Sequence, residues 1–105
     1  MASGILGQAA PSATTNTTVY TVPASTVSVV NVNIVNRGAS AATVRIALAA
    51  GGSPTNAEYI EYDTSVGAKQ VLERTGLALN AGKQVVIYAS SADTSVSVYG
   101  LEDAA

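Results

Sequence analysis

Three carboxylates that lie close together in the sequence, Glu58, Glu61 and Asp63, are the residues best suited to chemistry. Paired carboxylates can act as acid and base, or can bind calcium. In a strand, however, Glu58 and Glu61 would point to opposite faces of a sheet. The Asp-x-Asp-x-Asp-Gly pattern of a calcium loop is also missing. We therefore expect a solvated strand and turn here, with no metal site.

The residue types that most enzymes need are missing from the sequence. There is no histidine, the commonest general base, and no cysteine, so thiolate metal sites and disulfides are excluded. The run Gly51-Gly52-Ser53 lacks the lysine and the following helix of a phosphate loop. The sequence predicts that the protein is not an enzyme and holds no cofactor.

Tyrosines are the other residues with a possible binding role. Tyr59, Tyr88 and Tyr99 alternate with the apolar residues of their segments, which places them on outward faces of the predicted strands. Exposed aromatic side chains could form a sugar-binding platform, as in a glycan-binding adhesion module. They could equally pack at a subunit interface, where tyrosine is enriched.

Charge and hydropathy exclude two classes of partner. Five basic residues are set against seven acidic ones and form no basic cluster, so we expect no nucleic-acid partner. No segment approaches the roughly 20 apolar residues of a membrane span. The opening MASGILGQAA lacks the basic region of a signal peptide. We expect a protein that is made and used without secretion or membrane anchoring.

The segment Thr26–Leu48 predicts the element around which the other strands are arranged. Two alternating runs, TVSVVNVNIVN and ATVRIAL, flank the polar break RGASA. Alternation is typical of strands with one buried face, and five residues including Gly38 fit a hairpin loop. We therefore expect a central hairpin, with the side chain of Ala47 pointing outward.

Further short strands follow at intervals of about ten residues, which is typical of a sandwich or barrel. Residues 58–62 predict an edge strand, and 63–68 a turn. Residues 70–79 could form a strand with a bulge at Gly76, or a helical turn at 71–74. We expect an all-β fold, an antiparallel β-sandwich of about seven strands that is immunoglobulin-like or jelly-roll-like. Its predicted core consists of Val30, Val32, Ile34, Val44, Ile46, Leu48, Val85, Ile87, Val96 and Val98.

The chain divides into an extended N-terminal arm (1–16), a sandwich domain (17–101) and a frayed tail (102–105). The arm lacks hydrophobic periodicity and carries Ile5 and Leu6 as isolated large apolar residues. These two residues could dock on a neighbouring molecule, or the arm could be a frayed terminus.

Several motifs resemble those of small virion proteins of tailed bacteriophages. The sequence reads YTVPA at 20–24, and the predicted hairpin turn contains NRG at 36–38. Similar elements follow as Tyr59-Ile60-x-Tyr62-Asp63, Leu77-x-Leu79 and Val86-x-Tyr88-Ala89-Ser90, and the opening Leu6-Gly7-Gln8-x-Ala10-Pro11 also fits. The resemblance covers most of the chain.

This resemblance implies a structural module of the virion, made in the host cytoplasm. Such proteins are capsid cement (decoration) proteins, which bind the outer capsid surface and stabilise the shell, or small tail, baseplate and fibre components. They are often homotrimers, so the implied partners are further copies of this chain and the major capsid protein or another virion protein. Ile5, Leu6, Tyr59, Tyr88 and Tyr99 are the candidate interface residues.

Overall fold

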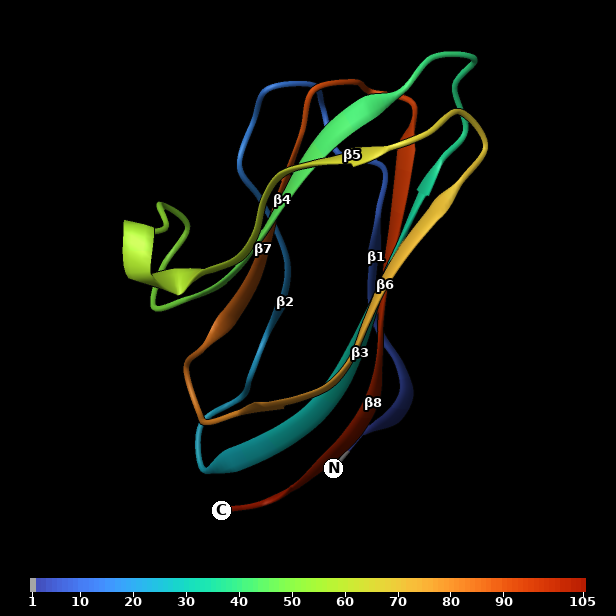
Figure 1. Ribbon diagram of the computed structural model, residues 1–105. Helices are drawn as coiled ribbons and strands as arrows, with labels where there is room; N and C mark the ends of the chain where they lie inside the picture. Colours follow the sequence, from blue (N-terminus) through green and yellow to red (C-terminus); the bar gives the residue numbers. More distant parts are fainter. Residues whose placement is uncertain (1) are drawn as a thin grey trace.

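The computed structural model describes residues 2–105, which form two four-stranded antiparallel sheets packed face to face (Figure 1). The expected antiparallel β-sandwich is confirmed, with eight strands and a short 3-10 helix. The strands are β1 (Ser3–Ala9), β2 (Thr17–Thr21), β3 (Thr26–Asn36), β4 (Ala42–Ala49), β5 (Tyr59–Val66), β6 (Val71–Leu79), β7 (Gln84–Ala89) and β8 (Thr94–Ala104), and the 3-10 helix is η1 (Asn56–Glu58).

The strand order is that of a jelly roll. Sheet A has the order β1-β8-β3-β6 and sheet B the order β2-β7-β4-β5, so the chain passes repeatedly from one sheet to the other. Eight strands wound in this way form the double-sheet jelly roll. An immunoglobulin fold instead places its first two strands side by side in one sheet. Of the two expected sandwich types, the structure therefore has the jelly-roll topology.

The expected central hairpin is wrong, although both of its strands exist. β3 pairs with β8 and β6 in sheet A, whereas β4 pairs with β7 and β5 in sheet B. Residues 37–41 cross from one sheet to the other at one end of the sandwich (Figure 1). Alternation specifies which side chains of a strand face the core, but it does not specify the neighbouring strand.

The predicted core is confirmed at all but one position. Side chains from both sheets meet in one cluster that includes Val30, Val32, Ile34, Val44, Ile46, Val85, Ile87, Val96 and Val98. Leu48 is the exception, because it is only partly buried and packs against the edge of this cluster.

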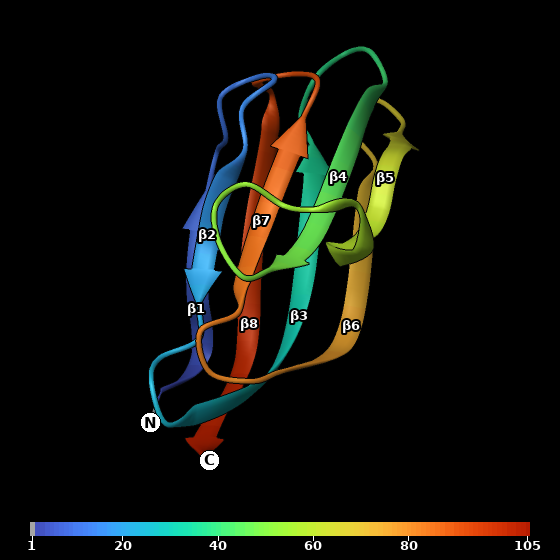
Figure 2. The ribbon, with the colours of Figure 1, turned by 90° about the vertical axis from the view of Figure 1, so that its left-hand side faces the viewer.

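A second small cluster lies on the outer face of sheet B. Ala47, expected to point to solvent, is fully buried there with Ala49 and Val86, and Tyr59 packs against them. The connection between β4 and β5, which contains η1, folds over this face (Figure 2). A loop cover of this kind leaves no periodic signal, so the sequence could not indicate it.

Strands β5 and β6 form the edge of the sandwich on one side. β5 is an edge strand, as expected, but it continues to Val66 through the predicted turn. β6 is a strand with a register shift opposite Val30 and Val32, and Gly76 adopts φ +69° within it. The bulged-strand alternative is thus confirmed and the helical turn is wrong.

The N-terminal arm and the C-terminal tail are largely strand. Ser3–Ala9 is β1, which pairs with β8 from Ser3↔Leu101 to Ala9↔Val96, and residues 102–104 pair with β3 as part of β8. The expected boundaries at 16 and 102 therefore do not separate the termini from the sandwich; Met1 lies outside the described residues. Pairing uses backbone N–H and C=O groups, so a strand of small, aperiodic residues can form without an alternating pattern.

Candidate functional surfaces

The acidic cluster is divided among structural roles. Glu58 accepts hydrogen bonds from the backbone N–H groups of Thr55 (2.8 Å) and Ala50 (3.0 Å), which fix the loop over sheet B. These two bonds hold the pKa of Glu58 below its usual value. In the part of the chain that the structure describes, acidic side chains form no group of three or more that could hold a metal ion.

Glu61 and Asp63 each bind an arginine. Glu61 accepts from the Thr64 hydroxyl at 2.6 Å and from Arg74 at 2.5 Å; these contacts lower the pKa of Glu61 although its desolvation opposes them. Asp63 accepts from Arg45 Nε at 2.7 Å. The expected solvated position is therefore wrong for Glu61, whose side chain is only 18% exposed. Asp63 is exposed, as expected, although it forms an ion pair.

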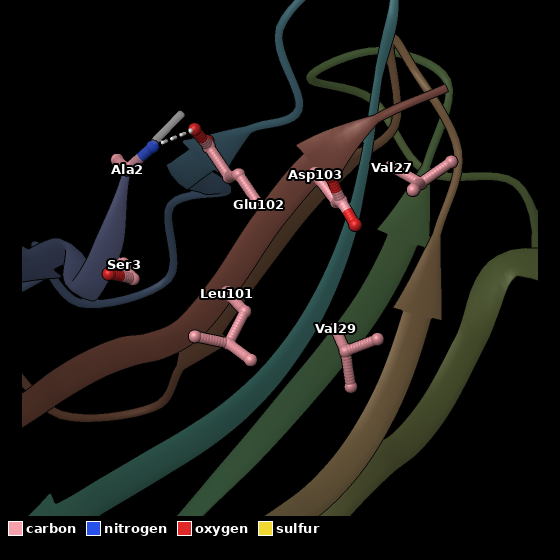
Figure 3. Close-up of a pocket in the computed structure, with 7 residues that line it drawn as sticks. All are labelled: Ala2, Ser3, Val27, Val29, Leu101, Glu102 and Asp103. Atoms are coloured by element: carbon pink, nitrogen blue, oxygen red, sulfur yellow. Dashed lines mark hydrogen bonds between the residues drawn. The ribbon is translucent and has the colours of Figure 1, made fainter.

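A chain of polar contacts, buried at Tyr20 and Ser28 and exposed at Ala2, ties the N-terminus to the sandwich. The Tyr20 hydroxyl donates to Glu102 Oε2 at 2.5 Å and lies 2.6 Å from Ser28 Oγ, and the Ala2 backbone N–H donates to Glu102 Oε1 at 3.1 Å (Figure 3). Burial and the Glu102 bond raise the pKa of Tyr20, whereas Tyr20 and the Ala2 N–H lower the pKa of Glu102. All four groups thus have polar partners that stabilise strand ends.

Exposed apolar side chains gather on the outer face of sheet A. Ile5, Val27, Val29 and Leu101 are 60%, 41%, 51% and 64% exposed, and we call these four residues the sheet A patch. Val29 lies directly opposite Leu101 in the β3–β8 register, and both line a hollow of about 420 Å³ (Figure 3). Contiguous exposed apolar surface of this kind typically marks an interaction site.

The two candidate residues of the expected arm point in different directions. Ile5 belongs to the sheet A patch, where it pairs with Tyr99 of β8. Leu6 follows at a register irregularity and packs against the core instead. The Tyr99 hydroxyl donates to Glu73 at 2.5 Å, which raises the pKa of Tyr99. Ile5 and Tyr99 therefore share one outer face, and Leu6 does not.

Tyr59 and Tyr88 lie on the opposite outer face, in what we call the sheet B cluster: Arg45, Tyr59, Tyr62, Asp63 and Tyr88. The Arg45 guanidinium lies 4.3 Å from the ring centroids of both Tyr62 and Tyr88, and the Asp63 carboxylate binds its Nε. Tyr59 contacts Tyr62 edge to face, with centroids 4.9 Å apart. The Asp63 hydrogen bond raises the pKa of Arg45.

Sequence reasoning missed Arg45 and Tyr62 as members of this cluster. The outward parity of Arg45 on β4 was a usable signal, because Tyr88 of the neighbouring strand β7 lies directly opposite it. Tyr62 gave no such signal. It has the same parity as the apolar Ile60, and the β4–β5 register shifts around it. Positive φ at Asp63 marks the same irregularity.

Among residues 2–105, no helix is long and apolar enough to cross a membrane. Comparison of the chain with protein-family models, with curated proteins and with solved structures finds no match.

Proposed function

We propose that this chain is a structural protein of a tailed-bacteriophage virion, a capsid cement protein that binds the outer surface of the shell as a homotrimer. The observation that carries the proposal is the sheet A patch. Of the large apolar residues exposed on the described chain, all but Tyr62 lie on this one face. The motif resemblance of the sequence supplies the identity of the partner.

The patch has the composition of a contact surface. Val27, Val29 and Leu101 come from the neighbouring strands β3 and β8, so their positions are fixed by backbone pairing before any partner binds. Pre-organised side chains lose little conformational entropy on association. Val71 adds a further exposed apolar side chain at the other end of the same face. The face is therefore suited to contact with a neighbouring subunit or with the shell.

The proposal includes no catalysis. The arrangement of Glu58, Glu61 and Asp63 supports a role without catalysis, because their oxygens already bind backbone N–H groups, a hydroxyl or an arginine. A tail, baseplate or fibre subunit is the alternative, and it would use the same apolar face against a different partner.

The test is binding of the purified protein to empty heads and to isolated tails of the phage that encodes it. We expect co-sedimentation with heads only, and a trimer by analytical ultracentrifugation. Leu101→Glu and Val29→Glu place a charge in the patch and should abolish attachment. Ser65→Glu is the matched control, because it places the same charge at an exposed position of β5, outside the patch. This variant should attach normally.

Two outcomes would count against the proposal. Attachment to tails only would select the alternative subunit role. If Leu101→Glu and Val29→Glu keep a wild-type circular dichroism spectrum and still bind heads with unchanged affinity, the sheet A patch is not the contact surface.

A further inference from the structure

We infer that Tyr59 and Tyr62 of the sheet B cluster, together with Asn56, form a binding site for neutral carbohydrate. A hollow of about 380 Å³ lies there between Asn56, Tyr59 and Tyr62. This volume is at the small end of the range of roughly 300–1,000 Å³ found for small-ligand pockets. A hollow of this size suits a single sugar unit held against the tyrosines. The site lies on sheet B, whereas the proposed shell-binding face is on sheet A.

The groups around the hollow match the two-sided chemistry of a sugar ring. A pyranose presents C–H groups on its faces and hydroxyls around its rim. Tyr62 is 57% exposed although Arg45 lies over one face of its ring, so the uncovered part of the ring can meet the apolar face of a sugar. The Asn56 amide offers both a donor and an acceptor for hydroxyls, and the Tyr59 hydroxyl can serve as either.

The aromatic side chains are held in place before a ligand arrives. Tyr59 packs on the buried Ala47, Ala49 and Val86 and meets Tyr62 edge to face. Glu58 fixes the loop that carries Asn56 through its bonds to Ala50 and Thr55. A fixed platform avoids much of the entropy cost of ordering side chains on binding.

The electrostatics of the cluster favour a neutral ligand. Arg45 already occupies the space over the rings of Tyr62 and Tyr88, the position that a quaternary ammonium ligand would need in an aromatic cage. Its charge is compensated by Asp63, so the cluster offers no uncompensated cation to an anionic ligand. The net charge of −2 further disfavours anions.

The first experiment probes the labelled full-length protein on an array of neutral and anionic glycans. Maltohexaose, cellohexaose and chitohexaose are then titrated in solution, with tyrosine fluorescence as readout because the chain has no tryptophan. We expect binding to at least one neutral glycan and no binding to sialylated or sulfated ones. No binding to any neutral glycan on the array would overturn the inference.

Variants locate the site with the best ligand found. Tyr62→Ala should weaken binding about two- to tenfold, the scale expected for removing one stacked ring. Tyr62→Phe keeps the ring and should retain binding. Tyr99→Ala, on the opposite face, is the matched control and should bind as wild type. Equal affinity of Tyr62→Ala and wild type, with both proteins folded, would show that the glycan binds elsewhere and overturn this assignment.

Discussion

Arg74 and Glu61 join the edges of the two sheets. Arg74 Nη1, on edge strand β6 of sheet A, lies 2.5 Å from Glu61 Oε2 on edge strand β5 of sheet B, and it also donates to the Ile60 carbonyl oxygen at 3.1 Å. β5 and β6 do not pair with each other, so this side-chain bridge is a direct polar link between the two layers on that side. The Glu61 side chain is only 18% exposed, so it depends on this partner more than a surface carboxylate would.

Replacement of Arg74 tests the bridge. Arg74→Leu leaves Glu61 without its cation, and we expect a loss of roughly 1–3 kcal/mol in the free energy of unfolding, the cost of a poorly satisfied polar group. Urea unfolding measures this loss. A double-mutant cycle with Glu61→Gln isolates the pairwise coupling. Zero coupling would mean that the pair behaves as an ordinary surface ion pair.

Acid should destabilise the protein through its hydrogen-bonded glutamates. The pKa of Glu102 is lowered in the fold, first by the Tyr20 hydroxyl and then by the Ala2 N–H. Because the pKa of Glu102 is lower in the folded than in the unfolded protein, ionised Glu102 stabilises the fold. This stabilisation is complete above the ordinary glutamate pKa of 4.5 and is lost as the pH falls through the lowered pKa of the folded state. Glu102→Gln should therefore show a smaller loss of stability than wild type between about pH 5 and pH 3.

The measurement is urea unfolding across that pH range. Glu58 and Glu61 also have lowered pKa values, so the variant should keep part of the acid dependence. Glu73→Gln is a control that leaves these three groups unchanged. Identical pH profiles for Glu102→Gln and wild type would show that Glu102 contributes nothing to acid sensitivity.

Adjacent valines on β3 give a matched test of the two faces. Val30 is fully buried in the core and Val29 is exposed on the sheet A patch. Val30→Ala should lower the free energy of unfolding by about 1–3 kcal/mol, because it removes buried methyl groups and leaves a cavity. Val29→Ala should change it by less than about 0.5 kcal/mol. A larger loss for Val29→Ala in denaturant unfolding would invert the assignment of the faces.

Gly7 permits close contact between the two sheets on the β1–β2 side. A Cβ atom at this position would lie 2.2 Å from the Val19 carbonyl oxygen, which is backbone and cannot rotate away. Gly7→Ala should thus force the strands apart and lower the melting temperature, at a cost of roughly 1–3 kcal/mol. Gly51→Ala, whose Cβ would meet no atom within 4 Å, should melt as wild type. Equal melting temperatures for both variants would contradict the contact.

The sequence predicts this fold at the level of side-chain pattern. Alternation in residues such as Val44, Ile46 and Ile87 identified the class and the core, because a strand with one buried face must alternate. Strand partners were not predictable, since β3 and β4 alternate equally well as a hairpin or in separate sheets. β1 was missed because its backbone pairs with β8 without any apolar period.

The candidate sites were predicted only in part. Outward parity placed Tyr59, Tyr88 and Tyr99 on outer faces, where all three are partly buried rather than exposed. It could not say that the first two lie on sheet B and the third on sheet A. The Arg45 contacts with Tyr62 depend on an irregular β4–β5 register. Patterns with a fixed period cannot anticipate such a shift.

The last prediction tests whether residues 1–9 are an integral edge strand of sheet A or a dispensable arm. Deletion of residues 1–9 removes β1, which pairs with one side of β8 from Val96 to Leu101, and withdraws Leu6 from the core. β8 keeps its pairing with β3 on the other side. The newly unpaired N–H and C=O groups of β8 would form an open edge next to the exposed Leu101. Open edges promote intermolecular strand pairing. We expect a lower melting temperature and polydisperse aggregates by analytical ultracentrifugation.

Ile5→Ser distinguishes backbone pairing from side-chain burial in this experiment. Ile5 is exposed, so the substitution removes an apolar side chain from the sheet A patch while β1 keeps its pairing with β8. This variant should melt as wild type and remain free of aggregates, and any defect should appear only in attachment to the shell. If instead the deletion variant melts as wild type and stays monodisperse, residues 1–9 are a dispensable arm, because a strand whose removal exposes the β8 edge cannot be lost without effect on stability or association.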